Sequence, residues 1–372
     1  MNTKFPNYDD CITNLSCSLL KHFEVPYKHN TIKEVDEMLE CNPKNVVVIL
    51  FDGMGYHLIN RILDEDSFIR TNMVKCYSSV SPSTTTASTT SMLSGLNPVE
   101  HGWLGWNVYF EPIDKIVTLY TNKLKGSEED AETYNVADHF LPYKNLKEQV
   151  KEGPYDASII FPFGNEVVYD GRNLDDMNDK IVGECNKSGK RLIYVYHEDP
   201  DTTLHLTGTK SKETIEMFKK IDESLKSLVK RLKDTVLIVT ADHGHMNSLP
   251  YIITDYKDFF DTLDGDTSIE SRFCSFKVKD GKEEDFVRLF NKYFSNDFVL
   301  KTKEEIINEG WFGTGEENKY FRSALGDYFA LAKSDRFFIY ENPDNEDIIL
   351  KSNHAGISED EIDIPLVMKR IR

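Results

Sequence analysis

Three segments that open with consecutive apolar, β-branched residues constrain the fold of this chain more than any other feature. They are NVVVILFD at 45–52, RLIYVYHEDPD at 191–201 and TVLIVTADHGH at 235–245. Such runs are typical of strands that are buried on both faces, as in parallel sheets. Residues 211–234 repeat apolar side chains along one helical face, after the N-cap residue Ser211. Strands that alternate with helices predict an α/β fold with a mostly parallel central sheet and helices on both faces.

The pattern changes in two other parts of the chain. Between about 256 and 345, short strand-like runs surround one helical segment, which predicts a smaller α+β insert. A second, less regular excursion rich in Tyr, Asp and Asn covers about 108–188. We therefore expect a core formed by residues 1–255 and 346–372, with residues 256–345 as an inserted cap that contributes to substrate binding.

The charge of the chain argues against one class of partner. Its 372 residues have a formal net charge of -19, whereas proteins that bind nucleic acid need clustered Lys and Arg. We expect no nucleic-acid polymer as partner, and an anionic substrate would need a local cation. The sequence has no signal-peptide-like apolar start and no run of about 18 apolar residues. This favours a cytoplasmic protein without membrane contact, and it leaves the oligomeric state open.

Each of the three predicted strands runs into a carboxylate. These are Asp52, Asp201 and Asp242, the last followed directly by His243. Because ligands collect outside the carboxyl ends of parallel strands, we expect these side chains to meet at one place. Carboxylates that converge without Lys or Arg repel one another unless cations lie between them. Asp and His are ligands that zinc accepts, so the pattern predicts a metal site.

Two further histidines could complete such a site. His205 lies four residues after Asp201, so one helical turn would place both on one face. His354 precedes another apolar, strand-like run in SNHAGISEDEIDIPLV. Other nearby residues could replace a ligand chosen here and remain as alternatives: His197, Glu198, Asp199 and His245.

A hydroxyl-rich segment, SPSTTTASTTSMLSG at 81–95, could supply a nucleophile. Pro82 ends any preceding structure, and a helix is expected from about Thr85 to Leu93. The free N–H groups and the dipole at a helix start bind phosphate, although Ser83 or Thr84 could simply cap the helix. A threonine hydroxyl is a weak nucleophile without activation. Two metal ions about 4 Å apart would provide it and would suit phosphoryl transfer.

Taken in order, these motifs resemble those of the alkaline phosphatase superfamily, in its nucleotide pyrophosphatase and phosphodiesterase branch. The motifs are FDGMG, SPSTTTASTTSMLSGLNPVEHG, YHEDPDTTLHLTG, TADHGH and SNHAGISEDEIDIPLV. The resemblance covers about 45–110, 190–250 and 345–370. It implies an alkaline-phosphatase-like fold and a metal-dependent hydrolase that acts on phosphate diesters or pyrophosphates of small, nucleotide-type substrates.

The resemblance also implies residue roles. Thr85 would be the nucleophile that is transiently phosphorylated, with Thr84 as its nearest competitor. Two divalent ions are implied, typically zinc and in some relatives manganese. The first would activate Thr85, and its ligands would be the Thr85 oxygen, Asp52, Asp242 and His243. The second would activate the hydrolytic water, and its ligands would be Asp201, His205 and His354. Asn107 would hold a phosphate oxygen, although it lies one residue later than the family spacing.

Other functions use nearly the same residues. A phosphonate hydrolase of the phosphonoacetate type and a phosphomonoesterase are the alternatives within hydrolysis. A non-catalytic protein that retains the metal site is the alternative of a different class, and the intact ligands and hydroxyl disfavour it. A dinucleotide-binding protein is disfavoured because G-x-G-x-x-G is missing after the strand that ends in FDGMG.

Overall fold

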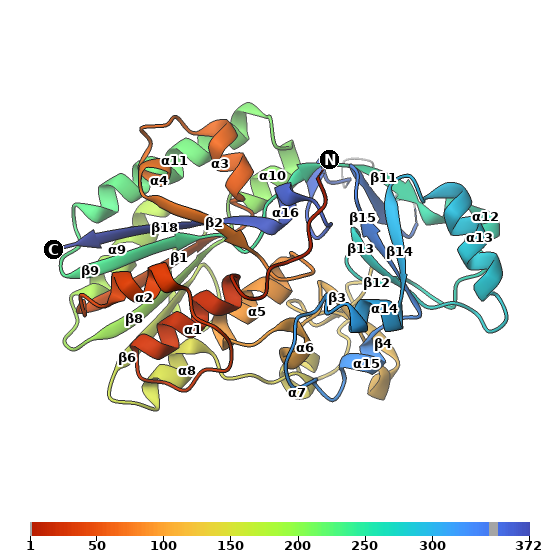
Figure 1. The fold of residues 1–372 in the computed structure, drawn as a ribbon, viewed down its shortest axis with the longest axis horizontal. Helices are drawn as coiled ribbons and strands as arrows, with labels where there is room; N and C mark the ends of the chain where they lie inside the picture. The colour runs from red at the N-terminus through yellow and green to blue at the C-terminus, as the bar shows by residue number, and fades with distance from the viewer. Residues whose placement is uncertain (1, 342–348) are drawn as a thin grey trace.

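A mixed sheet with one antiparallel strand lies at the centre of the left-hand part of the molecule in Figure 1. The computed structural model describes residues 2–341 and 349–372, and within these ranges the sheet has seven strands in the order β2-β18-β9-β1-β8-β6-β7. Their bounds are β1 (Asn45–Phe51), β2 (Met73–Ser78), β6 (Asp156–Phe161), β7 (Val167–Val168), β8 (Arg191–His197), β9 (Thr235–Thr240) and β18 (Asp363–Ile371). β1 pairs in parallel with both β8 and β9, whereas β18 is antiparallel to β2 and β9. The predicted α/β fold is confirmed, and its three marker strands lie side by side.

Helices cover both faces of this sheet (Figure 1). In one group, three helices pack against α1 (Ile12–His22): α2 (Lys33–Leu39), α5 (Thr85–Ser94) and α8 (Leu146–Lys151). The other consists of α3 (Tyr56–Ile62), α4 (Phe68–Thr71), α9 (Leu174–Cys185), α10 (Asp201–Thr207) and α11 (Lys212–Val229). The central strands are therefore buried on both sides, as their uninterrupted apolar sequence requires.

The longest helix, α11, shows why these faces form. Ser211 accepts a hydrogen bond from the Thr214 N–H at 3.0 Å and so caps the helix start. Phe218, Ile221 and Leu225 recur at helical spacing and are fully buried. Each such side chain stabilises the fold by about 1.5–3 kcal/mol relative to exposure. The amphipathic pattern predicted for 211–234 thus corresponds to a helix that ends at Val229.

A second sheet lies beside the core. Over the described residues it has seven strands in the order β14-β15-β13-β12-β3-β4-β5. Their bounds are β3 (Asn107–Phe110), β4 (Lys115–Thr118), β5 (Lys123–Leu124), β12 (Ser268–Ile269), β13 (Phe273–Phe276), β14 (Phe298–Thr302) and β15 (Tyr328–Ala332). The sheet reaches beyond the insert expected at 256–345, because β3, β4 and β5 come from 107–124 and join through the pairing of Ile269 with Asn107.

Both faces of the second sheet are covered by apolar side chains. Along β15, Phe329 and Leu331 pack into one buried cluster, while Ala330 and Ala332 pack into another. This alternation follows from the two-residue period of a strand. The second sheet therefore has an apolar core on each of its faces.

Further helices and strands complete the fold. The helices are α6 (Pro98–His101), α7 (Val136–Phe140), α12 (Lys257–Phe260), α13 (Glu283–Tyr293), α14 (Lys303–Asn308), α15 (Phe321–Ala324) and α16 (Glu359–Ile362), with 3-10 turns at Glu111–Ile113 and Ile253–Asp255. The strands are β10 (Met246–Asn247), β11 (Leu249–Ile252), β16 (Arg336–Ile339) and β17 (Ser352–Asn353). None of the helices in the described part of the chain is long and apolar enough to cross a membrane.

A buried ion pair ties the second sheet to the core. Arg272, just before β13, meets Glu361 of α16 through two hydrogen bonds, Nε to Oε1 at 2.7 Å and Nη2 to Oε2 at 2.9 Å. Both side chains are fully buried. Glu361 also accepts hydrogen bonds from the Gly356 N–H at 2.7 Å and the Ser358 hydroxyl at 2.6 Å. The pair thus holds the loop after His354 against the second sheet.

Candidate active site

The predicted ligands gather at the carboxyl ends of β1, β8 and β9. Asp52 follows β1, Asp201 opens α10 after β8, and Asp242 follows β9. The Asp201 N–H donates to the Asp52 carbonyl oxygen at 2.9 Å, and the Gly53 N–H donates to Asp242 Oδ1 at 3.0 Å. These hydrogen bonds hold the three loops together, so the parallel sheet places the carboxylates at one point, as its topology requires.

A first group of ligand atoms consists of Asp52, Asp242 and His243, which lie within 4.8 Å of one another. His243 Nε2 is 3.2 Å from Asp52 Oδ1 and 3.6 Å from Asp242 Oδ2. Asp242 Oδ2 is buried and has no hydrogen-bond partner among the described residues. A buried carboxylate oxygen without a donor is costly, and a cation would satisfy it. The residues present therefore fit a divalent metal ion.

The candidate nucleophile lies against this first group. Thr85 is the first residue of α5, and its Oγ1 is 3.3 Å from Asp52 Oδ2 and 3.3 Å from His243 Nε2. Its side chain is almost completely buried. Thr84 occupies the N-cap position without a capping hydrogen bond, and its hydroxyl donates to Glu270 instead. The structure thus distinguishes the two candidate nucleophiles, because only the Thr85 hydroxyl contacts the predicted metal ligands.

A second group surrounds Asp201. Four residues bring ligand atoms within 4.8 Å of one another: Asp201, His243, His245 and His354. His245 Nε2 lies 2.5 Å from Asp201 Oδ1, closer than His205 Nε2 at 3.3 Å or His354 Nε2 at 3.9 Å. His245, which the sequence leaves as an alternative, is thus a full member of the group. His205 lies one turn of α10 after Asp201, as its spacing predicts.

Three of the imidazole rings turn Nδ1 toward a backbone carbonyl oxygen. His205 Nδ1 is 2.7 Å from the Ser352 carbonyl oxygen, and His243 Nδ1 is 3.2 Å from that of Gly244. His354 Nδ1 is 3.2 Å from the carbonyl oxygen of Ser83. A carbonyl oxygen only accepts, so these partners assign a proton to Nδ1 and turn Nε2 toward the carboxylates, where it offers a lone pair whenever the ring is neutral. Metal-binding histidines are typically fixed in this way.

The charges in the site are unbalanced. Burial raises the pKa of Asp52 well above its usual value, and the nearby Asp201 raises it further. Burial likewise raises the pKa of Asp242, with Asp52 adding to the effect. Burial lowers the pKa of His354, and neighbouring histidines lower it further. Buried carboxylates that repel one another beside neutral imidazoles are the condition that bound divalent cations relieve.

Asp201 and His205 form the exception. Burial raises the pKa of Asp201, but the charge of His205 outweighs it and holds that pKa well below its usual value. Burial lowers the pKa of His205, yet Asp201 outweighs this and raises it to about 9. The two side chains therefore stabilise each other as an ion pair, which keeps Asp201 charged at neutral pH.

One glycine of the ADHGH motif is required by packing. A Cβ at Gly244 would lie 2.1 Å from the carbonyl oxygen of Asp360, far inside contact distance. Only glycine allows the loop to pack this closely. This contact keeps His243 and His245, on either side of Gly244, at the carboxyl end of β9.

Three side chains at the site lie outside the principal ligand set predicted from the sequence. Besides His245, the Tyr196 hydroxyl of β8 donates a hydrogen bond to Asp52 Oδ2 and orients that carboxylate. Glu270 follows β12 of the second sheet, and its Oε1 accepts from the Thr84 hydroxyl at 2.6 Å and the Trp106 N–H at 2.7 Å. Burial raises the pKa of Glu270 to about 7. Tyr196 and Glu270 belong to no recognisable sequence motif. Of the three side chains, only His245 could have been found from the sequence, because it is the second histidine of ADHGH.

Asn107 lies at the edge of the site. Its Oδ1 accepts from the Thr118 hydroxyl at 2.7 Å, and it lines a cavity of about 860 Å³ together with Glu270 and Asn353. Asn353 directly precedes His354, so this cavity borders the second group of ligand atoms. A role for Asn107 on a phosphate oxygen stays a prediction.

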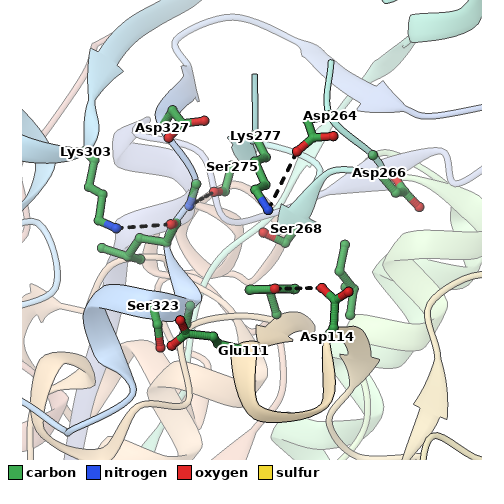
Figure 2. Close-up of a pocket in the computed structure, with 16 residues that line it drawn as sticks. Glu111, Asp114, Asp264, Asp266, Ser268, Ser275, Lys277, Lys303, Ser323 and Asp327 are labelled. Carbon is green, nitrogen blue, oxygen red and sulfur yellow. Dashed lines mark hydrogen bonds and ion pairs between the residues drawn. The ribbon is translucent and has the colours of Figure 1, made fainter. Parts of the chain in front are cut away.

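Another cavity, of about 550 Å³, lies in the second sheet (Figure 2). Acidic side chains line much of it, and Lys277 and Asp264 form an ion pair at 3.7 Å across it. Its lining contains none of the residues predicted to bind metal or to act as nucleophile. The chemistry is therefore assigned to the site at the ends of β1, β8 and β9.

Comparison with known proteins agrees with this geometry. Residues 46–354 match the model of the type I phosphodiesterase / nucleotide pyrophosphatase family. Comparison with curated proteins gives no significant match. Murine ectonucleotide pyrophosphatase / phosphodiesterase 5 is similar in structure, with a TM-score of 0.67 and 17% identity over 86% of this chain and 87% of that chain. An inactive threonine-to-alanine variant of that enzyme, in complex with AMP, has a TM-score of 0.65 and 16% identity over 86% and 87%.

A bacterial enzyme has a similar fold. Phosphonoacetate hydrolase from Sinorhizobium meliloti 1021, in complex with phosphonoacetate, has a TM-score of 0.66 and 13% identity over 89% of this chain and 91% of that chain. At these identities the structural likenesses establish the fold, and they do not distinguish phosphate esters from phosphonates.

Proposed function

Because the chain belongs to the type I phosphodiesterase / nucleotide pyrophosphatase family, we propose that it is a two-metal hydrolase of phosphate diesters or pyrophosphates with Thr85 as its nucleophile. One observation carries the proposal. Thr85 Oγ1 lies 3.3 Å from both Asp52 and His243, within a buried set of carboxylates and imidazoles whose atoms are close enough to share metal ions. The AMP complex of the murine relative supports a small, nucleotide-type substrate.

The donor set supports two divalent ions. Asp52, Asp242 and His243 would hold one ion beside Thr85, and carboxylate with imidazole is a combination that zinc favours. The other would be held by Asp201, His205 and His354, with His245 as a further ligand. When bound, the ions would supply the positive charge that lowers the pKa of the threonine hydroxyl and stabilises the charge developing on phosphate oxygens.

The side chains of the chain itself would carry out the rest of the reaction. The Thr85 oxygen attacks phosphorus as its hydroxyl proton passes to solvent. The bond from phosphorus to the oxygen of the leaving alcohol or phosphate breaks, and the leaving group departs on the opposite side. The free N–H groups in the first turn of α5 bind the phosphate oxygens. Tyr196 keeps Asp52 oriented through its hydrogen bond. Water then hydrolyses the phosphothreonine and restores Thr85.

Metal content tests the ligand assignment. We expect purified protein to contain about two ions per chain, and His354→Ala to retain about one, because the second group loses an imidazole that Ser83 orients. Elemental analysis of both proteins measures this. His139→Ala removes an exposed histidine of α7 and should retain both ions. An active enzyme free of metal would refute the two-metal proposal.

Substrate preference tests the reaction class. The proposal predicts faster turnover of bis-p-nitrophenyl phosphate and of a dinucleotide than of p-nitrophenyl phosphate or phosphonoacetate. A monoester carries an additional negative charge, which a site with so many carboxylates is poorly suited to neutralise. Values of kcat/KM for the four compounds provide the measurement. Faster monoester turnover would refute the preference for diesters, and turnover of phosphonoacetate alone would identify a phosphonate hydrolase.

A further inference from the structure

Glu270 lies beside the proposed nucleophile, although it comes from the second sheet. Its Oε1 accepts hydrogen bonds from the hydroxyl of Thr84, the residue before Thr85, at 2.6 Å and from the Trp106 N–H at 2.7 Å. Among the described residues, both hydrogen bonds to this carboxyl end on the same oxygen. Oε2 is therefore available to a ligand.

The backbone holds Glu270 rigidly. The preceding residue, Ile269, has a φ of +74°, a left-handed conformation that a β-branched residue rarely adopts. Gly105 packs against it so closely that a Cβ at position 105 would lie 2.7 Å from the Ile269 carbonyl oxygen. Two residues further on, Arg272 is held by Glu361. A strained residue held from both sides is characteristic of a functional position.

Among the described residues, Glu270 forms no ion pair, and its two hydrogen-bond donors, the Thr84 hydroxyl and the Trp106 N–H, are neutral. It lines the cavity of about 860 Å³ next to Asn353 and Asn107. Lys125 is the one cation among the described residues of that lining, and its Nζ already pairs with Asp266 at 2.7 Å. A carboxylate that faces a cavity whose one described cation is already paired attracts donor or cationic groups of a ligand and repels anionic ones.

We propose that Glu270 is a specificity-determining residue of the proposed hydrolase. It selects diesters whose second ester group carries a hydrogen-bond donor or a cation, and it rejects diesters whose second ester group carries a carboxylate. The inference rests on the proposed function, because Thr85 defines where the phosphorus binds. It also narrows the substrate class of that function, because the negative charges of Glu270 and of the phosphonoacetate carboxylate would repel each other and disfavour this substrate.

Three matched substrates test the selection. They are p-nitrophenyl phosphodiesters whose second ester group is 2-aminoethyl, ethyl or carboxymethyl, assayed at pH 8.5, where Glu270 is ionised. We expect kcat/KM to fall in that order, by about tenfold or more from the first to the last. This is the size of effect expected from a charged hydrogen bond between the ammonium group of the first substrate and Glu270. Glu270→Gln keeps the shape and the acceptor for Thr84, and it should reduce the spread to within about threefold. Glu111→Gln, an exposed change at the remote cavity (Figure 2), should leave the order unchanged.

A binding measurement separates this inference from the proposed function. Calorimetric Kd values of the same three compounds for Thr85→Ala, with and without Glu270→Gln, report selection without turnover. One outcome is that wild-type protein hydrolyses none of the esters while the protein with Glu270 still binds the aminoethyl, ethyl and carboxymethyl compounds in order of increasing Kd. In that case the proposed function fails and the selectivity of Glu270 stands. An unchanged order in Glu270→Gln, or an equal loss for all three compounds, would overturn the assignment of Glu270.

Discussion

Thr85→Ala is expected to lower kcat for bis-p-nitrophenyl phosphate by at least about 10³-fold, the scale at which loss of a covalent nucleophile acts. The side chain meets Asp52 and His243 through Oγ1, so alanine removes the reacting atom and leaves the carboxylates and imidazoles in place. Alanine also favours helix, so α5 should still begin at residue 85. Turnover and metal content should be measured on the same preparation, and we expect the metal to be retained.

Neighbouring threonines provide matched controls for this variant. Thr86 is buried, and its Oγ1 has no hydrogen-bond partner among the described residues, so Thr86→Ala should retain full activity. Thr84→Ala removes the donor to Glu270 and should lower activity far less than Thr85→Ala. Unchanged turnover in Thr85→Ala would exclude Thr85 as the nucleophile. If turnover were lost completely in Thr84→Ala and retained in Thr85→Ala, Thr84 would be the nucleophile instead.

Glu361→Ala is expected to destabilise the protein by about 3–5 kcal/mol, because it leaves the guanidinium of Arg272 buried without its partner. Both side chains are fully buried and joined by two hydrogen bonds, so solvent does not screen the pair. Urea unfolding measures the loss. The exposed pair of Glu317 and Arg322 is the control, and Glu317→Ala should cost no more than about 1 kcal/mol.

Two further measurements separate charge from packing at this pair. Replacing both partners by leucine should cost less than Glu361→Ala, because no charge is left buried. Burial raises the pKa of Glu361, but Arg272 outweighs it and holds the pKa below its usual value of 4.5. A depressed pKa in the folded state adds stability above about pH 4.5 that is lost as the pH falls further. Glu361→Gln should lack this acid-sensitive contribution, and identical acid unfolding of the two proteins would contradict the account.

Much of the scaffold could be predicted from the sequence. The runs at 45–52, 191–201 and 235–245 are the adjacent strands β1, β8 and β9. A strand buried on both faces tolerates polar side chains only where it leaves the sheet, so the ends of these strands and their carboxylates coincide. The helix expected from Thr85 to Leu93 is α5, which ends one residue later, at Ser94. The predicted ligands are therefore close in space, while their binding of metal stays a prediction.

The side chains that lie outside the principal ligand set share one property, which is a partner distant in sequence; His245 was predicted only as an alternative ligand, and Tyr196 and Glu270 were not predicted. His245 and Asp201 are 44 residues apart, Tyr196 and Asp52 are 144 apart, and Glu270 and Thr84 are 186 apart. Hydrophobic periodicity reports which face of one element is buried, and it carries no information on which loops of different sheets meet. The extent of the second sheet was missed for the same reason, since it pairs Ile269 with Asn107.

The sequence by itself determined the α/β core and the chemical types of side chain that end its central strands, because burial on both faces dictates apolar runs and polar ends. The tertiary structure decided which of the histidines turn Nε2 toward Asp201, because that depends on backbone acceptors such as Ser352 and Ser83 in other loops. It also decided that Glu270, an acidic side chain of the second sheet, contacts Thr84, the residue before the proposed nucleophile, because the buried pair of Arg272 and Glu361 joins the two sheets nearby.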